Sequence, residues 1–292
     1  MIISAGDGGR VTAVGLADWG VRAVVETQSG ADTEVLVVET VGAVRVLRIN
    51  RPAKLGAFNW PLIDQWADAL VAAGSDPSVR AVVLTGTGRG FCAGVDLEEF
   101  ETAGESPIER KRVLTDRVHK VARAVEDLDK PLLCAVNGLA IGAGMDMALM
   151  CDIRLAGETA KFSEGYINIG LVPGDGGCYF LPRLVGTARA LELLWTGDTI
   201  SAQQALTMGV VSHVYPDHEL MDRAMELAAR IASRSPIAVA MIKRSLYQSL
   251  RLDLRTSLDL ISSHMGIVQS TLDQAEAVQA FRERRTPQFR DR

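Results

Sequence analysis

The chain has 292 residues, of which 48% are hydrophobic and 23% charged, as expected for a folded protein with a sizeable core. Its net charge of −5 gives no general reason to expect nucleic acid as a partner, and no apolar run of about 18 residues predicts a membrane span. The first ten residues lack the basic and apolar regions of a secretory signal, so we expect a cytoplasmic protein.

The first predicted elements are a hairpin and a helix. Residues 1–32 show no helical or strand period, and we interpret them as an N-terminal extension. Apolar residues predict strands at 34–39 and 43–50, joined by a turn at Val41-Gly42. Asn59 can then cap a helix. The spacing of Leu62, Trp66 and Leu70 places these apolar residues on one face of that helix.

Strand and helix signals alternate through the middle of the chain. Strands are predicted at 80–85 and 132–136, and shorter elements continue to about residue 214. The alternation favours an α/β fold. Between the two strands, apolar residues recur at spacings of four and three, which predicts a helix with a stripe of Leu114, Val118, Val121, Val125 and Leu128.

From residue 219 onward the strand signals stop. We therefore divide the chain into the extension at 1–32, an α/β core at 33–218 and a helical C-terminal region at 219–292. The helical region is apolar on one side and too small to stand alone, so it is expected to pack on its own core or on another subunit. A helix is predicted from Glu219 onward, and further helices are predicted at 236–252, 254–271 and 273–285.

A loop of very small residues precedes an apolar helix at Gly142-Ala143-Gly144. Small residues let a ligand approach the backbone, and the first N–H groups of a helix have no internal partner. Asp146 lies in the first turn of this helix. The pattern indicates an oxyanion hole with an acid/base beside it.

A second glycine-rich loop, Gly86–Leu97, follows the predicted strand at 80–85. Its glycines permit backbone angles at which N–H groups can point at a ligand. Two such loops after two strands can meet at one oxygen atom.

Together with three further motifs, these loops resemble the enoyl-CoA hydratase/isomerase (crotonase) superfamily, from about Glu34 to Phe289. The resemblance implies a spiral of ββα units, with C-terminal helices that build trimers or hexamers. It also implies an acyl-CoA thioester as substrate and no cofactor apart from the coenzyme A of that substrate. The further motifs are Asn50–Asn59, Val172–Gly177 and Ala280–Arg285.

The resemblance assigns the two oxyanion donors to the N–H groups of Val95 and Ala143. Asp146 occupies the position of one of two glutamates with which hydratases of the family hold and activate water. Tyr166 stands at the position of the second. A phenol with an ordinary pKa of about 10 is a poor base at neutral pH, so the two-carboxylate mechanism cannot simply be transferred.

Two nearby carboxylates could compensate. Glu164 lies two residues before Tyr166, on the same face if this piece is extended. Asp175 lies in a glycine-rich turn, one position later than an aspartate found in isomerase branches of the family. It could also be a turn residue that bonds its own backbone.

The remaining polar residues give a weaker signal. The four histidines are scattered and indicate neither a metal site nor a catalytic triad, and His119 and His218 are interpreted as surface residues. The four cysteines lack metal-ligand spacing and are expected to be reduced. Residues that resemble the family's coenzyme A contacts are Lys54, Leu55, Ala57, Ala93 and Gly94, with Arg282, Arg284 and Arg285 available for the phosphates unless they only form a solvated face.

We therefore expect an enzyme that stabilises a thioester enolate, with hydration of an enoyl-CoA as its reaction. The alternatives are double-bond isomerisation, which needs one proton shuttle, retro-Claisen hydrolysis, and a non-catalytic protein that binds acyl-CoA.

Overall fold

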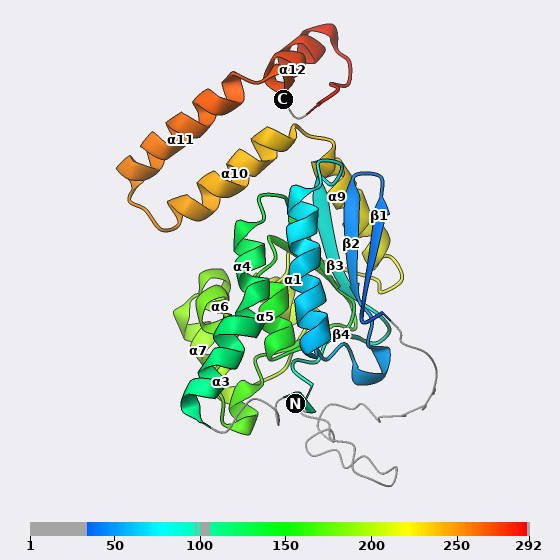
Figure 1. The fold of residues 1–292 in the computed structure, drawn as a ribbon, viewed down its shortest axis with the longest axis vertical. Helices are drawn as coiled ribbons and strands as arrows, with labels where there is room; N and C mark the ends of the chain where they lie inside the picture. Colours follow the sequence, from blue (N-terminus) through cyan, green and yellow to red (C-terminus); the bar gives the residue numbers. More distant parts are fainter. Residues whose placement is uncertain (1–33, 97, 100–105, 291–292) are drawn as a thin grey trace.

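The computed structural model describes residues 34–96, 98–99 and 106–290, so the predicted extension lies outside the described residues. Two sheets form the centre of the core and helices cover them (Figure 1). In spatial order, the larger sheet contains β1 (Leu36–Val41), β2 (Val44–Ile49), β3 (Ala81–Gly86), β5 (Leu132–Val136), β7 (Ile153–Gly157) and β10 (His213–Tyr215).

The larger sheet confirms the predicted hairpin, since β1 and β2 pair antiparallel from Leu36–Ile49 to Val41–Val44. All other neighbours in this sheet are parallel. Parallel strands with helices on both faces are buried, and every residue of β3 is buried.

The smaller sheet contains β4 (Gly90–Cys92), β6 (Leu139–Ile141), β8 (Lys161–Ser163) and β9 (Ile200–Ser201). The pairs β3–β4, β5–β6 and β7–β8 each give one strand to the larger sheet and the next to the smaller one. This repeated ββ step, followed by helices, agrees with the ββα spiral that the resemblance implied. It brings the loops after β4 and β6 close together.

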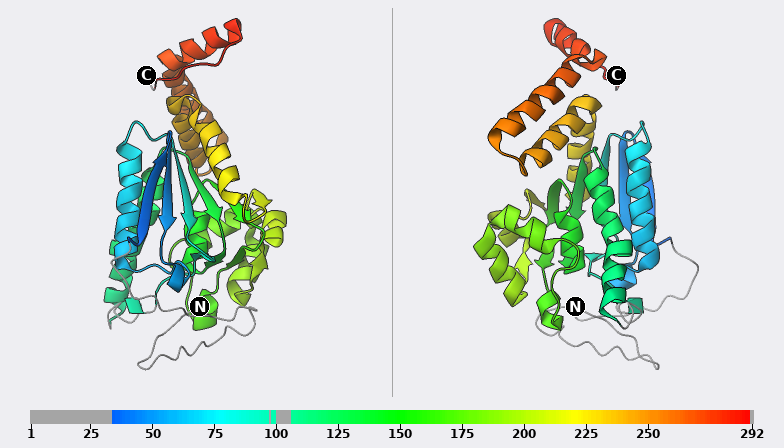
Figure 2. Two further views of the ribbon diagram at one scale, coloured as in Figure 1. Left: turned by 90° about the vertical axis from the view of Figure 1, so that its right-hand side faces the viewer. Right: turned by 60° about the vertical axis from the view of Figure 1, so that its left-hand side comes forward.

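Helices α1 (Trp60–Ser75) and α9 (Leu220–Ala232) cover opposite faces of the larger sheet (Figure 2). Asn59 caps α1 as predicted, because its side chain accepts a hydrogen bond of 3.1 Å from Leu62 N. The predicted stripe of Leu62, Trp66 and Leu70 is buried against the core.

The long helix predicted before β5 differs from the structure in its first half. It consists of α3 (Pro107–Val113), a π-helical turn (Leu114–Val118) and α4 (His119–Asp127). The wider turn rotates the start of the apolar stripe, so Leu114 is 37% exposed while Val118, Val121 and Leu128 are buried as expected.

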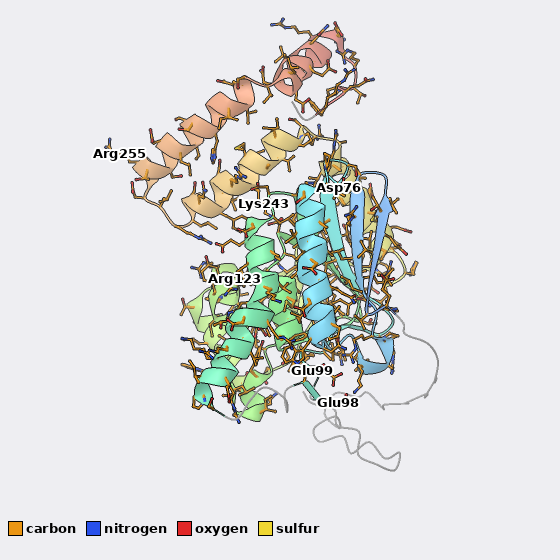
Figure 3. The ribbon with its side chains drawn as sticks, in the orientation of Figure 1. Asp76, Glu98, Glu99, Arg123, Lys243 and Arg255 are labelled. Carbon is orange, nitrogen blue, oxygen red and sulfur yellow. The ribbon has the colours of Figure 1, made fainter. Side chains whose placement is uncertain are left out.

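Three C-terminal helices project from the end of the core (Figures 1 and 2). Lys243 lies on the side of α10 (Pro236–Ser249) that faces the core, and Arg255 lies at the outer end of α11 (Leu254–Gln269) (Figure 3). Polar contacts attach α10 to the core: Asp152 accepts hydrogen bonds of 2.8 Å from Lys243 Nζ and from Tyr247 O–H. The helices are α10 (Pro236–Ser249), α11 (Leu254–Gln269) and α12 (Leu272–Glu283).

The remaining helices lie beside the smaller sheet and include the short α5 that follows β6. None of the helices in the described part of the chain is long and apolar enough to cross a membrane. The remaining helices are α5 (Ala143–Leu149), α6 (Gly177–Val185), α7 (Thr187–Thr196) and α8 (Ala202–Met208).

Candidate active site

The two glycine-rich loops meet, as predicted from the sequence. A Cβ atom on Gly94 would lie 3.1 Å from Ile141 O and 3.8 Å from Ala143 N. Gly94 and Gly142 have φ values of +95° and +53°, which side chains rarely adopt. Gly94 therefore leaves room for the two loops to approach each other, and both glycines supply the positive φ values that the loops require.

Two N–H groups at this junction are free of backbone partners among the described residues: those of Val95 and Ala143. Phe58 bonds on both sides of Val95, donating to Gly94 O and accepting from Asp96 N, each at 2.8 Å. In such a parallel bridge, the N–H of Val95 itself points away from Phe58. Ala143 is the first residue of α5, where an N–H has no partner within the helix. The pair can bind one oxygen that carries negative charge.

Ion pairs hold the first loop in place. Asp96, only 3% exposed, accepts a hydrogen bond of 2.8 Å from Arg51 Nη2, and Lys54 Nζ lies 3.5 Å from its other oxygen. Lys54 also lies 3.2 Å from Glu98, which lies at the end of the molecule opposite α10 (Figure 3). A buried carboxylate next to Val95 is thus neutralised by two cations, which fixes the backbone there.

The structure brings together most residues predicted to contact coenzyme A. Leu55 O accepts a hydrogen bond of 3.1 Å from Ala93 N, and Ala57 O accepts one of 2.5 Å from Arg51. Arg284 does not join them in this subunit. It follows α12, at the opposite end of the molecule from β4 (Figure 1). Its neighbour Arg285 is paired with Glu276 and Glu283.

A buried acidic cluster lies behind the two N–H groups. The Tyr166 O–H, from the 3₁₀ helix η4 (Tyr166–Ile169), lies 2.8 Å from Asp146 Oδ2 and 2.9 Å from Asp175 Oδ2. Asp175 N donates to Asp146 Oδ2 at 3.2 Å. A phenol has a single proton, so its close contact with two carboxylates is favourable when one of them is protonated. The arrangement therefore favours a second proton, held by one of the two carboxyls.

Glu164 belongs to the same cluster. Its carboxyl is 1% exposed, and neither oxygen has a hydrogen-bond partner among the described residues. A Cβ atom on Gly177, the first residue of α6, would lie 2.7 and 2.9 Å from the two Glu164 oxygens and would overlap Asp146 Oδ1. The structure thus gathers all four predicted catalytic side chains, and Gly177 is a packing position that sequence reasoning missed.

Burial and mutual repulsion raise the pKa values of the cluster. Burial, followed by the negative charge of Asp175, raises the pKa of Asp146 to about 7. Burial also raises the pKa of Asp175, against the lowering effects of the Tyr166 hydrogen bond and of His119. An acid that titrates near neutral pH can both accept and release a proton during turnover.

The expectation that His119 is a surface residue is wrong. His119 is half-buried, and its Nε2 lies 2.8 Å from Gly174 O, in the turn that holds Asp175. The π-helical turn before α4 brings it there, and apolar periodicity carries no signal for such a turn. His218 is exposed, as expected.

The cysteines are all free thiols, and three of them are buried. In the described part of the chain, no group of three or more His, Cys, Asp or Glu side chains could hold a metal ion. The free N–H groups of Val95 and Ala143 and the acidic cluster can together stabilise an oxyanion next to a carboxyl that moves protons.

A family model for enoyl-CoA hydratase/isomerase matches residues 39–292. The chain belongs to the enoyl-CoA hydratase/isomerase family. A solved enoyl-CoA hydratase from Bacillus anthracis shares the crotonase fold with a TM-score of 0.85 and 34% identity, over 89% of this chain and all of that one.

Two relatives from Escherichia coli are similar over nearly their whole length. A 2,3-dehydroadipyl-CoA hydratase is 37% identical over 88% of this chain and 99% of its own. A 1,2-epoxyphenylacetyl-CoA isomerase is 36% identical over 88% of this chain and 98% of its own. Membership of the enoyl-CoA hydratase/isomerase family therefore does not by itself select the reaction.

The burial of Asp146 predicts a pH-dependent effect on stability. Because its pKa is raised in the folded state from 3.8 to about 7, its contribution to stability is present at acidic pH and lost as the pH rises through 7. Asp146→Asn removes the buried charge and keeps the shape. Above pH 7, we expect the variant to unfold at a higher temperature than the wild type. The difference in free energy of unfolding should be at most roughly 4 kcal/mol.

Thermal unfolding on both sides of pH 7 measures this effect. The two proteins should converge in stability toward acidic pH. A variant that is less stable than the wild type at alkaline pH would contradict the charged, buried state of Asp146.

The packing at Gly177 predicts a second effect. Gly177→Ala should lower kcat about 100-fold or more, because its Cβ displaces the carboxyls of Asp146 and Glu164. The matched control is Gly74→Ala, an exposed position in α1 whose Cβ would meet only Leu128 at 3.6 Å. Equal activity of the two variants would show that the contact at Gly177 is not needed.

Proposed function

We propose that the protein hydrates an enoyl-CoA thioester and that Asp146 transfers the proton. One observation carries this proposal: a buried carboxyl that titrates near pH 7 lies on the same short helix as the free N–H of Ala143. The hydratases among its relatives support the same reaction class.

In the proposed reaction, the thioester oxygen of the substrate accepts hydrogen bonds from Val95 N and Ala143 N. Water adds to the β-carbon, and its proton passes to ionised Asp146 while the double-bond electrons move to the thioester oxygen. The enolate then collapses, and its α-carbon takes the proton back from Asp146. One water is consumed and Asp146 regains its initial charge. Loss of one oxyanion donor costs about 100- to 1000-fold in such reactions.

Asp175 and Tyr166 take the place of the second glutamate in this proposal. The phenol joins the two carboxylates within hydrogen-bond distance, so Asp175 can orient water while Tyr166 donates a hydrogen bond and keeps its proton. Coenzyme A would bind along Lys54, Leu55, Ala57, Ala93 and Gly94, which lie close together where the segment around Leu55 contacts the loop after β4.

Isomerisation is the second candidate, and the replacement of one glutamate by Tyr166 favours it. Moving a double bond requires a single proton shuttle, which Asp146 could supply alone.

A substrate panel separates the two reactions. We expect turnover of 2-enoyl-CoA thioesters to 3-hydroxyacyl-CoA, with Asp146→Asn lowering kcat far more than it raises KM, because the backbone N–H groups bind the substrate independently. Conversion of 3-enoyl-CoA without hydration would establish isomerisation. Hydrolysis of a cyclic β-ketoacyl-CoA would establish a retro-Claisen reaction, and binding without turnover a non-catalytic role.

Substitutions in the second half of the cluster test its function. Tyr166→Phe and Asp175→Asn should each lower kcat about 100-fold or more, and the double variant should lose much less than the product. Asp68→Asn, at an exposed position in α1, is the control for loss of a carboxylate. Near-normal hydration by both single variants would leave Asp146 acting without them.

We further propose that the C-terminal helices assemble the protein into a trimer or a hexamer. Apolar side chains along these helices are exposed in the single subunit, which an assembly would cover. Arg284 could then reach the coenzyme A phosphates of a neighbouring subunit. The exposed residues include Ile242 (67%), Leu246 (55%), Leu250 (67%), Leu254 (75%) and Phe281 (85%).

Light scattering tests the assembly. We expect the mass of a trimer or a multiple of it, and a smaller species for Leu250→Glu. The matched control is Val71→Glu, which changes an exposed apolar residue of α1 (60% exposed) and should leave the mass unchanged. A wild-type monomer at micromolar concentration would rule out this arrangement.

A further inference from the structure

Asp146 uses only one of its two carboxyl oxygens within the network described above. Oδ2 accepts hydrogen bonds from Tyr166 and from Asp175 N. Oδ1 is buried and has no side-chain partner among the described residues, although the backbone N–H of Gly177 stabilises ionised Asp146 and lowers its pKa. The proton transfer assigned to Asp146 leaves this second oxygen unexplained.

Glu164 supplies two further oxygens in the same condition. Both are buried without a partner, and both lie within 3 Å of the point that a Cβ on Gly177 would occupy. Asp146 Oδ1 borders the same point. Three carboxyl oxygens without a side-chain partner therefore surround one small space beside α6. Two ionised carboxylates cannot share such a space at low cost, because burial and repulsion both disfavour the second charge.

Apart from the partial positive charge at the N-terminus of α6, the other groups around this space offer no positive charge to Glu164. Tyr166 and Asp175 are acids that face Oδ2 of Asp146, and Cys178 is the thiol next to Gly177 on α6. His119, from α4, reaches only Gly174 O and acts on Asp175. No described cationic side chain forms an ion pair with Glu164. A proton is therefore the charge that can compensate the pair.

We propose that Glu164 remains a neutral carboxylic acid at neutral pH and donates its proton to Asp146 Oδ1. Glu164 is then a positioning residue: it orients and stabilises ionised Asp146, which alone exchanges protons with the substrate and water. This inference rests on the role proposed for Asp146. It assigns the partner of Asp146 to position 164, two residues before the phenol that replaces a family glutamate.

The direction in which the pKa of Glu164 is shifted agrees with this arrangement. Burial raises it well above its ordinary value, and the negative charge of Asp146 raises it further. The proton on Glu164 is thus held more tightly once Asp146 has ionised. The hydrogen bond that a neutral carboxylic acid donates to an ionised carboxylate is of a short, strong type.

Two substitutions distinguish a neutral donor from an ionised base. Glu164→Gln keeps an N–H donor without a charge, and we expect its kcat to stay within about threefold of the wild type. In its pH profile, kcat should still fall on the acidic side near pH 7. Glu164→Met removes the donor, so the ionised form of Asp146 is destabilised. The fall in kcat on the acidic side of its pH profile should move to higher pH by about one unit, so kcat at pH 7 should fall about fivefold with little change in KM.

Either of two kinetic results would overturn the proposal. If Glu164→Gln is as impaired as Glu164→Met, the carboxyl itself must ionise or transfer a proton. If Glu164→Met keeps the wild-type pH profile, Glu164 does not act on Asp146. Glu158→Gln, at an exposed position between β7 and β8, controls for loss of a glutamate and should retain the wild-type profile.

Infrared spectroscopy tests the protonation of Glu164 without any turnover. At about pH 8, the wild type should show the carbonyl stretch of a protonated carboxyl, and Glu164→Gln should lack that band while Glu158→Gln retains it. An identical spectrum for the wild type and Glu164→Gln would contradict a neutral Glu164. Since this readout needs no substrate, it separates failure of the Glu164 proposal from failure of the proposed hydratase activity.

Discussion

A carboxylate buried at the start of a short apolar helix is the constraint on which the site depends. Asp146 is fully buried, and the rest of α5 is apolar and buried as well. An unpaired charge at such a place would be expensive. Burial and the charge of Asp175 raise the pKa of Asp146 to about 7, while hydrogen bonds from Tyr166, Gly177 and Asp175 reduce the cost of ionisation. The same burial thus shapes both stability and chemistry.

The fold supplies this environment through its repeated ββ step. Each step sends the chain from the larger sheet into the smaller one, so the loops after β4 and β6 lie next to each other while their strands remain buried. Helix α5 is fixed at its far end by Arg154, a buried cation that donates to Leu149 O and Cys151 O. A cation at the C-terminus of a helix complements the helix dipole. The free N–H at Ala143 is therefore held on a short, rigid element.

Local patterns in the sequence predicted the parts of the site that lie close together along the chain. The free N–H of Ala143 and the acid Asp146 are separated by a single helical turn, so one motif contains both. The hairpin at Gly42, the cap at Asn59 and the two glycine loops are also local signals, and the structure confirms them. Contacts between distant segments left no such signal.

Glu164 and His119 illustrate what the sequence could not supply. The expectation for Glu164 assumed an extended chain, but β8 ends at Ser163 and a 3₁₀ helix begins at Tyr166. Glu164 and Tyr166 therefore approach different oxygens of Asp146 rather than lying side by side. His119, directly after a π-helical turn, lies 2.8 Å from Gly174 O, and the apolar spacing of the sequence carries no signal for such a turn.

The phenol at position 166 follows from the same electrostatics. The cluster already contains three buried carboxyls, at Asp146, Glu164 and Asp175, and none of them forms an ion pair with a cationic side chain in the described part of the chain. A fourth carboxyl at position 166 would add another group that favours the neutral form, and each would raise the pKa values of the others. Burial and the charge of Asp146 raise the pKa of Tyr166 well above its ordinary value, so the phenol keeps its proton. It can join two carboxylates by hydrogen bonds without adding a negative charge, which is why the acids at 164 and 175 can coexist with Asp146.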